Sequence, residues 1–331
     1  MSFSELGLSQ FGIPSFAKCR QVSVNEPWEA DVAILGVPFD QGAGFRSGTR
    51  HGPKHIRDWS VRYSSLSSTD NPGIFDVRKQ SRRACATIVD CSDVEILPLV
   101  WEDNFARITD AVSGILKHGA MPITLGGDHS IAFPVVRAFE RQRPLTVVQF
   151  DAHTDYRDDV HGVRYGHGNA LRRIGELPFV ERIVAIGINS YRQQEGDLKA
   201  HRDHGNEIIY AYQIHDQGVE PFLEKLPTDR DVYITFDIDA FDASVAPGTG
   251  TPEPGGLNFI QVRRLLDFIC SRNTIVGLDI VEVNPLYDPS FITALLANHV
   301  IVEILSTLYG PKRTPSVENK FASCEKSPAF R

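Results

Sequence analysis

The chain has 331 residues, with 34 Lys and Arg against 42 Asp and Glu, a net charge of −8 and 42% hydrophobic residues. This is the balance of an ordinary globular protein. The acidic charge argues against a nucleic-acid partner and suits a small cationic substrate. No apolar run reaches about 20 residues, so we expect no membrane span and no membrane partner. The start of the chain lacks a basic segment followed by an apolar core, so we expect no signal peptide. The five cysteines form no C-x-x-C pair and indicate reduced thiols in a cytoplasm.

The order of the expected elements indicates the fold class. Residues 1–30 are irregular and predict an arm lying over the surface or over a neighbouring subunit; 31–309 form the main domain, and the proline-containing stretch 310–331 predicts a tail. We predict strands near residues 32–37, 87–91, 121–125, 145–150, 183–188, 208–210, 232–236 and 275–281, and helices near 54–63, 103–118, 131–142, 221–226, 260–271 and 290–308. Residues 64–83 are expected to be an exposed loop. Strands alternating with helices predict an α/β fold with a mainly parallel sheet.

Potential metal ligands follow three of these strands. The run LTVVQF is followed by Asp151, His153 and Asp155, at every second position. Alternate side chains of an extended chain point the same way, so these three are able to converge on one spot. The D-x-H triplet alone is equally compatible with a polar loop, but two further clusters follow the same rule.

The second cluster is LGGDHS, where His129 is a candidate ligand and Asp128 a residue that orients a ligand. The third is FDIDAFD, where Asp237 and Asp239 are again two apart after a strand. Sites in open α/β sheets form beyond the carboxyl ends of the strands. We therefore expect the three clusters to meet at one edge of one sheet.

The charges of this group predict metal ions. Asp151, Asp155, Asp237 and Asp239 carry four negative charges, which would repel one another without cations. Two divalent ions would balance them, and mixed carboxylate and imidazole ligands suit Mn²⁺, Ni²⁺, Fe²⁺ or Zn²⁺ rather than Ca²⁺. Two such ions in one site can activate a water for hydrolysis.

Several motifs together resemble the ureohydrolase family of arginase and agmatinase. They are GVPFDQGAGFRSGTRHGPKHI, GGDHS, DAHTD, the D-x-D of FDIDAFD, APGTGTPEPGG and GLDIVEVNP, which occur in the family's order between about residues 30 and 308. APGTGTPEPGG is more similar to agmatinase and the guanidino acid hydrolases than to arginase. The resemblance implies a three-layer α-β-α fold with a mainly parallel sheet, and two metal ions held by His129, Asp151, His153, Asp155, Asp237 and Asp239, with Mn²⁺ expected and Ni²⁺ the alternative.

The resemblance also implies roles outside the metal ligands. His167, in GHG, matches a residue thought to pass a proton to the leaving amine, and Glu282 matches a carboxylate that pairs with the guanidinium. Asp155 belongs to the catalytic group, and Asp128, Asp242 and Asp279 are expected behind the ligands. A homo-oligomer, a trimer or hexamer, is expected by the same resemblance.

The segments that face the substrate depart from the family pattern. Tyr156, Arg157, Asp158 and Asp159 do not match agmatinase or arginase, and the chain reads Gly168-Asn169 where relatives commonly read G-T. Elsewhere it reads Asp242-Ala243 where relatives read D-P, a small backbone change. Arg157, Asn169 and Thr249 are candidate substrate-binding residues, although a turn role suits Thr249 equally. Arg157 either binds a substrate carboxylate or is neutralised by Asp158 or Asp159. The substrate therefore stays open among agmatine, guanidino acids and small alkylated guanidines.

Two other functions are compatible with parts of the pattern. A deacetylase-type metal amidohydrolase would share the D-x-H and D-x-D pieces, but a His-His pair would be expected where this chain has Asp128-His129. A silent partner subunit of a hetero-oligomer would have lost ligands, and none is lost.

Overall fold

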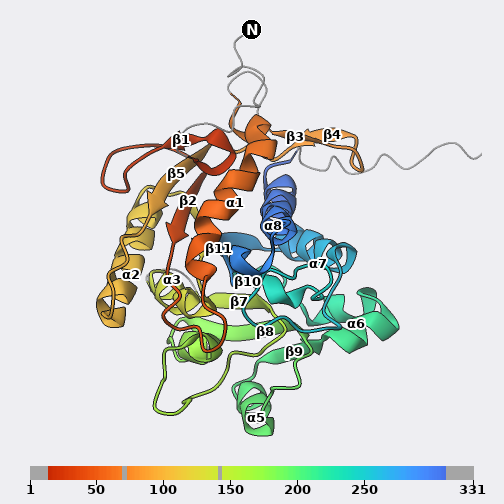
Figure 1. The fold of residues 1–331 in the computed structure, drawn as a ribbon. Helices are drawn as coiled ribbons and strands as arrows, with labels where there is room; N and C mark the ends of the chain where they lie inside the picture. Colours follow the sequence, from red (N-terminus) through yellow and green to blue (C-terminus); the bar gives the residue numbers. More distant parts are fainter. Residues whose placement is uncertain (1–13, 69–72, 141–143, 311–331) are drawn as a thin grey trace, which may run out of the picture.

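The computed structural model describes residues 14–68, 73–140 and 144–310. A sheet of nine parallel strands runs through it in the order β1-β5-β2-β6-β11-β10-β7-β8-β9, and a separate hairpin pairs β3 with β4 (Figure 1). The strands are β1 Arg20–Gln21, β2 Val32–Val37, β3 Ile74–Asp76, β4 Ser81–Arg83, β5 Ile88–Asp93, β6 Met121–Gly126, β7 Leu145–Phe150, β8 Val180–Ile188, β9 Glu207–Tyr210, β10 Asp231–Asp237 and β11 Thr274–Val281. The α/β class with a mainly parallel sheet is confirmed.

Helices cover both faces of the sheet. They are α1 Gly52–Ser60, α2 Trp101–Lys117, α3 Ala132–Arg137, α4 Ala170–Gly175, α5 Glu195–Asp203, α6 Ala211–Gln217, α7 Phe259–Arg272 and α8 Ile292–Leu308. One core contains the buried faces of α1, α6, α7 and α8, and the other those of α2, α3 and α4. This is the expected three-layer arrangement.

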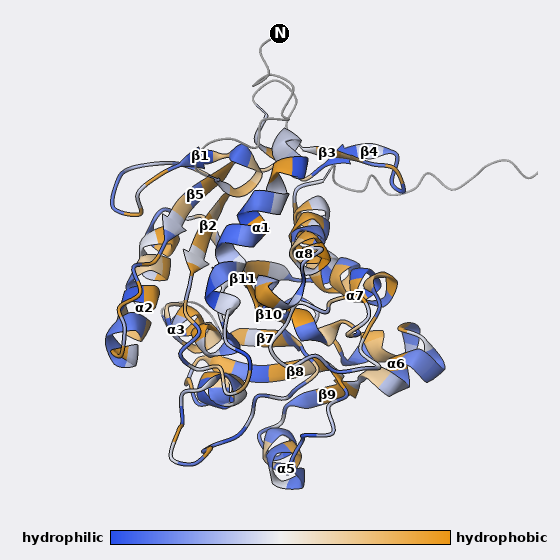
Figure 2. Cartoon of the chain, in the orientation of Figure 1, coloured by the Kyte–Doolittle hydropathy of each residue, from blue (hydrophilic) through white to orange (hydrophobic). Residues whose placement is uncertain are grey.

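The alternation of side chains along one strand explains the two cores. In β2, Val32 and Ile34 belong to the core under α1 and α8, while Ala33, Leu35 and Val37 belong to the core under α2. A strand buried on both faces reads as a continuous apolar run because each face needs its own apolar side chains. Figure 2 shows the same contrast, with mainly apolar central strands and α8, and a mainly polar α5 at the edge.

Some expected elements differ in the structure. The loop expected at 64–83 contains the β3–β4 hairpin, and residues 220–225 form a 3₁₀ helix rather than an α-helix. Helices α4, α5 and α6 were not expected. Of the expected arm and tail, residues 1–13 and 311–331 lie outside the described residues. Within the described ranges, no helix is both long and apolar enough to cross a membrane.

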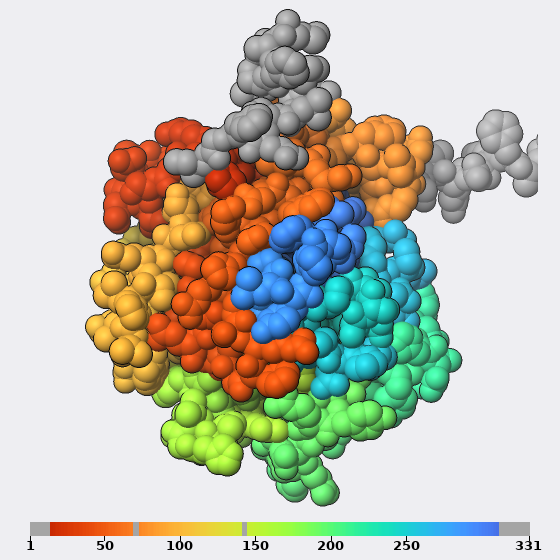
Figure 3. Space-filling view, in the orientation of Figure 1, coloured from red at the N-terminus to blue at the C-terminus, as the bar shows by residue number. Residues whose placement is uncertain are grey.

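The loop after β2 joins distant parts of the chain. The Asn284 amide donates hydrogen bonds to the carbonyls of Arg46 (3.3 Å) and Ser47 (3.0 Å). In Figure 3 the orange-red surface of the early chain accordingly lies side by side with the blue surface of the C-terminal part. The loop after β2 is thereby fastened to the segment that follows β11.

Candidate metal centre and active site

Four neighbouring strands deliver the predicted site residues to one edge of the sheet. Strands β6, β11, β10 and β7 are adjacent in that order. His129 comes shortly after β6, Glu282 directly after β11, Asp237 ends β10 and Asp151 directly follows β7. Because all four strands are parallel, their carboxyl ends share one edge. The sheet itself therefore gathers residues that lie up to 153 positions apart in the sequence.

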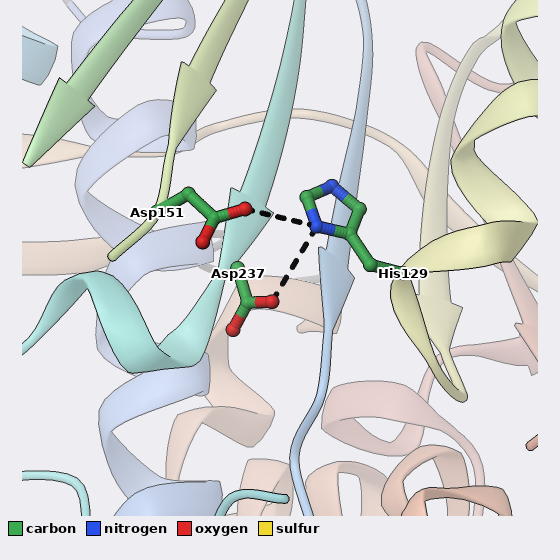
Figure 4. Close-up of side chains that lie close together, drawn as sticks. All are labelled: His129, Asp151 and Asp237. Carbon is green, nitrogen blue, oxygen red and sulfur yellow. Dashed lines mark ion pairs between the residues drawn. The ribbon is translucent and has the colours of Figure 1, made fainter. Parts of the chain in front are cut away.

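The first group of possible ligands surrounds one nitrogen of His129. His129 Nδ1 lies 3.0 Å from Asp151 Oδ2, 3.0 Å from Asp155 Oδ2 and 3.4 Å from Asp237 Oδ2. Figure 4 shows Asp151 and Asp237 converging on this nitrogen from neighbouring strands. His129 and Asp151 are fully buried.

The second group shares Asp151 with the first. His153 Nδ1 lies 3.5 Å from Asp151 Oδ1 and 3.2 Å from Asp239 Oδ2. The atoms of Asp151, His153 and Asp239 are close enough to hold one cation, as are those of His129, Asp151 and Asp237. A carboxylate with one oxygen in each group is suited to bridge two ions.

The chemistry of these side chains fits cations. His129 Nδ1 is buried and has no hydrogen-bond partner among the described residues, although carboxylate oxygens surround it. Burial, together with the neighbouring Asp239 and Asp151, raises the pKa of Asp237 well above its ordinary value. For His129, burial opposes a charge, but its carboxylate neighbours outweigh that effect and raise its pKa well above the usual range. The group is therefore short of positive charge, which two divalent cations would supply.

Outer hydrogen bonds hold the ligands in place. Thr235 Oγ1 lies 2.9 Å from His129 Nε2 and donates to Asp279 Oδ1 at 2.7 Å. The Gln149 amide donates to Asp151 Oδ2 at 2.8 Å. Such partners fix the orientation of an imidazole or carboxylate ligand. Of the expected outer residues, Asp279 thus reaches His129 through Thr235.

Asp128 and Asp242 fasten loops. The amide of Gly42 donates to Asp128 Oδ2 at 2.7 Å, which ties the loop after β2 to the site. Asp242 accepts hydrogen bonds from the amides of Ser244 at 2.9 Å and Gly255 at 2.6 Å. Asp242 therefore closes the loop that carries the PEPGG segment.

Two site residues have left-handed backbones. Asp155 has φ of 46° and Glu282 has φ of 62°. Residues other than glycine rarely adopt this region, and where they do, the surrounding structure imposes it, often at functional sites. At Glu282 the imposed conformation is accompanied by a hydrogen bond of 2.8 Å from its amide to the carbonyl of Gly127.

His167 and Glu282 are in contact beside the metal ligands. Glu282 Oε1 accepts a hydrogen bond from the His129 amide at 2.9 Å and lies 3.2 Å from His167 Nδ1. His167 Nε2 accepts a hydrogen bond from the Gly44 amide at 3.2 Å. These bonds describe a neutral ring with its proton on Nδ1. Burial lowers the pKa of His167, but the carboxylates of Glu282, Asp155 and Asp128 outweigh it and raise that pKa to about 9. Cations bound among these carboxylates would oppose the rise and favour the neutral ring.

A cavity of about 1480 Å³ opens onto these groups. Its wall includes His153, Asp155, His167, Asp237 and Thr251. Glu282 is buried beside His167 and is 1% exposed. A ligand in the cavity therefore meets the metal ligands and His167 on the same wall.

The three predicted substrate-binding residues have different surroundings. Arg157 lines the cavity, but its Nε pairs with Asp197 Oδ2 at 3.3 Å and its guanidinium donates to the Arg192 carbonyl at 2.8 Å. Asn169 lines the cavity but is 1% exposed, and its amide bonds to the carbonyl of Arg157 at 2.9 Å. Thr249 is fully buried, and its hydroxyl has no hydrogen-bond partner within the described ranges.

The expected partners of Arg157 are engaged elsewhere. Asp158 pairs with Arg164 at 2.8 Å and with Arg173, and Asp159 accepts from the Gly162 amide at 2.8 Å. Asp197, on the unexpected helix α5, neutralises Arg157 instead. The neutralisation was anticipated as an alternative, but the residue that provides it was not.

Three further residues near the metal ligands were not singled out from the sequence. Thr235 contacts His129, Thr251 Oγ1 donates to Asp239 Oδ2 at 3.0 Å, and Glu253 Oε1 lies 3.4 Å from His153 Nε2. The two threonines gave no signal because hydroxyls are common in strands and turns. Glu253 lies within the PEPGG segment that carries the family resemblance. A carboxylate in that segment was the one sequence feature that could have indicated its contact with His153.

Comparison with known proteins agrees with this architecture. A structure of proclavaminate amidinohydrolase from Streptomyces clavuligerus is similar, with a TM-score of 0.79, 33% identity and coverage of 90% of this chain and 98% of that one. The sheet, its covering helices and the His/Asp group at the strand ends define an α/β enzyme of arginase-like architecture.

The sequence comparisons give the family. The model of the Arginase family matches residues 30–306. A guanidinobutyrase of Pseudomonas aeruginosa is 34% identical over 289 residues, covering 86% of this chain and 88% of that protein, and the mitochondrial agmatinase of Gallus gallus is 35% identical over 288 residues, covering 85% and 82%. The chain belongs to the arginase family and is an enzyme of the ureohydrolase class.

Proposed function

We propose that this chain is a binuclear metal-dependent hydrolase that cleaves a guanidino compound into urea and an amine. The observation that carries the proposal is the pair of ligand groups that share Asp151. Relatives named guanidinobutyrase, agmatinase and proclavaminate amidinohydrolase support the substrate class. No comparable observation favours a deacetylase or a silent partner subunit.

The ligands divide between two ions. His129, Asp151, Asp155 and Asp237 would hold one, and Asp151, His153 and Asp239 the other. Bound there, two ions would lower the pKa of a water, so that it could attack the guanidinium carbon near neutral pH. Mn²⁺ is the expected ion and Ni²⁺ the alternative.

The protein groups orient the substrate and handle protons. In the reaction, a water oxygen bonds to the guanidinium carbon, the bond from that carbon to the substituted nitrogen breaks, and the amine leaves with a proton. Glu282 would offer a carboxylate to the guanidinium, and its contact with His167 supports a position for the imidazole near that carbon. His167 lines the cavity and is the group that would pass the proton to the leaving amine.

The proposal extends to the assembly, by the family resemblance, and to the location, by the cysteines. We place the enzyme in the cytoplasm as a homo-oligomer, a trimer or hexamer. Free cysteines at Cys19, Cys91 and Cys270, all buried, are compatible with a reducing compartment.

Release of urea tests the proposal. The metal-free protein is loaded with Mn²⁺ or Ni²⁺ and incubated with guanidine, butylguanidine, agmatine and 4-guanidinobutyrate. Urea from at least one of them, dependent on metal, is expected. If no urea is released from any of these substrates with either metal, the proposed reaction is refuted.

A further inference from the structure

The outer part of the cavity has an aromatic wall. Trp101 and Tyr165 stack with ring centroids 4.8 Å apart and planes 25° apart, and each is 37% exposed. Both line the cavity, as do Leu99 and Val163, which are 94% and 53% exposed. Large apolar groups exposed together usually mark a binding surface.

The wall packs against other aromatic rings and shares the cavity with His167. Trp101 begins α2 and meets Phe105 edge-on, with ring centroids 5.5 Å apart. The ring centroids of Tyr165 and Phe133 are 5.7 Å apart. Tyr165 is two residues before His167, which contacts Glu282. His167, Trp101 and Tyr165 line the same cavity, so a substituent on a guanidinium held beside His167 extends into the space that the wall borders.

The cavity is also larger than a guanidinium requires. Its volume of about 1480 Å³ exceeds the roughly 300–1,000 Å³ usual for small-molecule sites. A substrate that fills more of it must carry a substituent on the guanidine. The nature of the wall then decides which substituent is favoured.

The charges around the cavity are largely neutralised. Asp40 pairs with Arg50 and accepts from the Gly48 amide at 2.8 Å, and Arg157 pairs with Asp197. Apart from the metal ligands and Asp40, the described residues that line the cavity include no carboxylate, so the ammonium of agmatine finds no free partner. Among the lining arginines Arg192 has no side-chain ion pair in the described part of the chain, and it is exposed on a loop.

We propose that the outer cavity selects guanidines whose substituent is uncharged and apolar, such as an alkyl or benzyl group, with Trp101 and Tyr165 as its binding wall. The proposal rests on the proposed function of the same site. The competing possibility is a substrate with a carboxylate tail that binds Arg192, and the experiment distinguishes the two.

A substrate series of matched length provides the test. Butylguanidine, agmatine and 4-guanidinobutyrate differ at the far end of a four-carbon chain, which is a methyl group, an ammonium or a carboxylate. We expect kcat/KM for urea release to be highest with butylguanidine, and benzylguanidine to behave similarly. A higher kcat/KM with agmatine or 4-guanidinobutyrate would overturn the proposal. If 4-guanidinobutyrate is preferred and Arg192→Gln loses that preference, the cavity selects a carboxylate tail instead.

Variants of the wall make the test specific. Trp101→Gln should lower kcat/KM for butylguanidine and benzylguanidine by about 10-fold, the effect of losing one or two buried methylene contacts, and should leave guanidine unaffected. Trp101→Phe should retain the preference, which excludes a folding defect as the cause. Tyr191→Ala is the control, because Tyr191 is a fully exposed aromatic residue beside the cavity-lining Arg192.

Other outcomes have defined meanings. If Trp101→Gln ranks the substrates by kcat/KM as the unmodified protein does, the proposed role of Trp101 and Tyr165 in substrate selection is refuted. A lower molar mass of Trp101→Gln in light scattering, with all substrates affected alike, would overturn it too and make the surface a contact between copies of the chain. If the unmodified protein releases no urea from any guanidine, the proposed function itself fails.

A second and independent inference concerns the two histidine ligands, which have different neighbours. The far nitrogen of His129 meets the neutral hydroxyl of Thr235 at 2.9 Å. The far nitrogen of His153 lies 3.4 Å from the carboxylate oxygen of Glu253, and Ser190 Oγ donates to that same oxygen at 2.5 Å. A carboxylate behind an imidazole ligand fixes its orientation and raises its basicity.

We infer that Glu253 is a positioning residue for His153 and strengthens metal binding in the group of Asp151, His153 and Asp239. Ser190 orients the carboxylate and also accepts a hydrogen bond from the Arg192 amide at 3.1 Å. The same contacts therefore join the second ligand group to the loop at 190–193, whose Arg192 and Gln193 line the cavity.

Calorimetric titration with Mn²⁺ tests this inference without reference to activity. Glu253→Gln should weaken one of the two binding events by about 10–100-fold and leave the other unchanged. Ser190→Ala should have a smaller effect in the same direction. Glu220→Gln, an exposed carboxylate paired with Arg264, is the control.

Two results would overturn the role of Glu253. One is unchanged binding at both sites in Glu253→Gln, and the other is equal weakening of both. Failure of the unmodified protein to bind two ions would count against the proposed function instead.

Discussion

His201 gives the chain a specific sensitivity to acid beside the active site. It lies on α5, is fully buried, and packs edge-on against Tyr156 with ring centroids 4.6 Å apart. Neither ring nitrogen has a hydrogen-bond partner in the described ranges. Burial, and then the nearby Arg202 and His204, lower the pKa of His201 to about 3.

The sign and size of the effect follow from linkage. Below pH 6.5 the unfolded chain binds a proton at this histidine, whereas the folded chain does not until about pH 3. The contribution to stability is therefore complete above pH 6.5 and is lost as the pH falls toward 3. At about 1.4 kcal/mol per pH unit, the loss between pH 8 and pH 5 is about 2 kcal/mol.

His201→Leu should remove this loss. Because the ring makes no hydrogen bond, an apolar side chain of similar size leaves no polar group unpaired. Urea unfolding of the metal-free proteins at pH 8 and pH 5 measures the difference. The free energy of unfolding of His201→Leu should fall by about 2 kcal/mol less than that of the unmodified protein.

The control is His161→Leu, at an exposed position. Its free energy of unfolding should change between pH 8 and pH 5 by as much as that of the unmodified protein. Equal pH dependence of His201→Leu and the unmodified protein would refute the argument. It would mean that the folded chain accommodates a charge on His201.

Four further predictions concern the site and the assembly. Asp151→Ala and Asp237→Ala should lose most bound metal and nearly all urea release, because each carboxylate faces the buried ligand groups; two retained ions with normal turnover, by metal analysis and kinetics, would contradict their assignment. His167→Ala should keep both ions but lower kcat by roughly 10²–10⁴, and an unchanged kcat would make His167 a bystander. Arg157→Ala should leave the substrate ranking unchanged and cost at most about 1 kcal/mol of stability, because Asp197 already neutralises this partly exposed side chain; a gain in relative activity on agmatine would show that Arg157 acts on the substrate. Light scattering at micromolar concentration should give the mass of a trimer or hexamer, and a monomer would refute the predicted assembly.

The gathering of the candidate metal ligands at one edge of the sheet was predictable because their positions follow from local rules. Asp151, His153 and Asp155 directly follow a strongly apolar strand, and the strands before His129 and Asp237 are equally clear. Parallel strands bring their carboxyl ends to one edge, so three local patterns are sufficient to predict one site. The long helices α2, α7 and α8 were also predicted, and in α2 the apolar residues recur at helical spacing.

The outer contacts were not predictable because they join segments whose spatial relation is set by packing. Arg157 and Asp197 are 40 positions apart, and α5, which carries Asp197, is short and mainly polar, with His201 as its buried residue. Glu253 reaches His153 across 100 positions of sequence. The β3–β4 hairpin was missed because its second strand reads SRR and lacks the alternation of a half-buried strand.

The most direct test of the binuclear hydrolase is a titration of the metal-free chain with Mn²⁺. Urea release is measured at each metal concentration with butylguanidine, agmatine, 4-guanidinobutyrate and guanidine. Shared use of Asp151 by two ligand groups predicts that the rate with at least one substrate rises until two equivalents of metal are bound per chain, and then stays constant. Full activity at one equivalent, or no urea from any substrate at any metal concentration, would contradict the binuclear hydrolase.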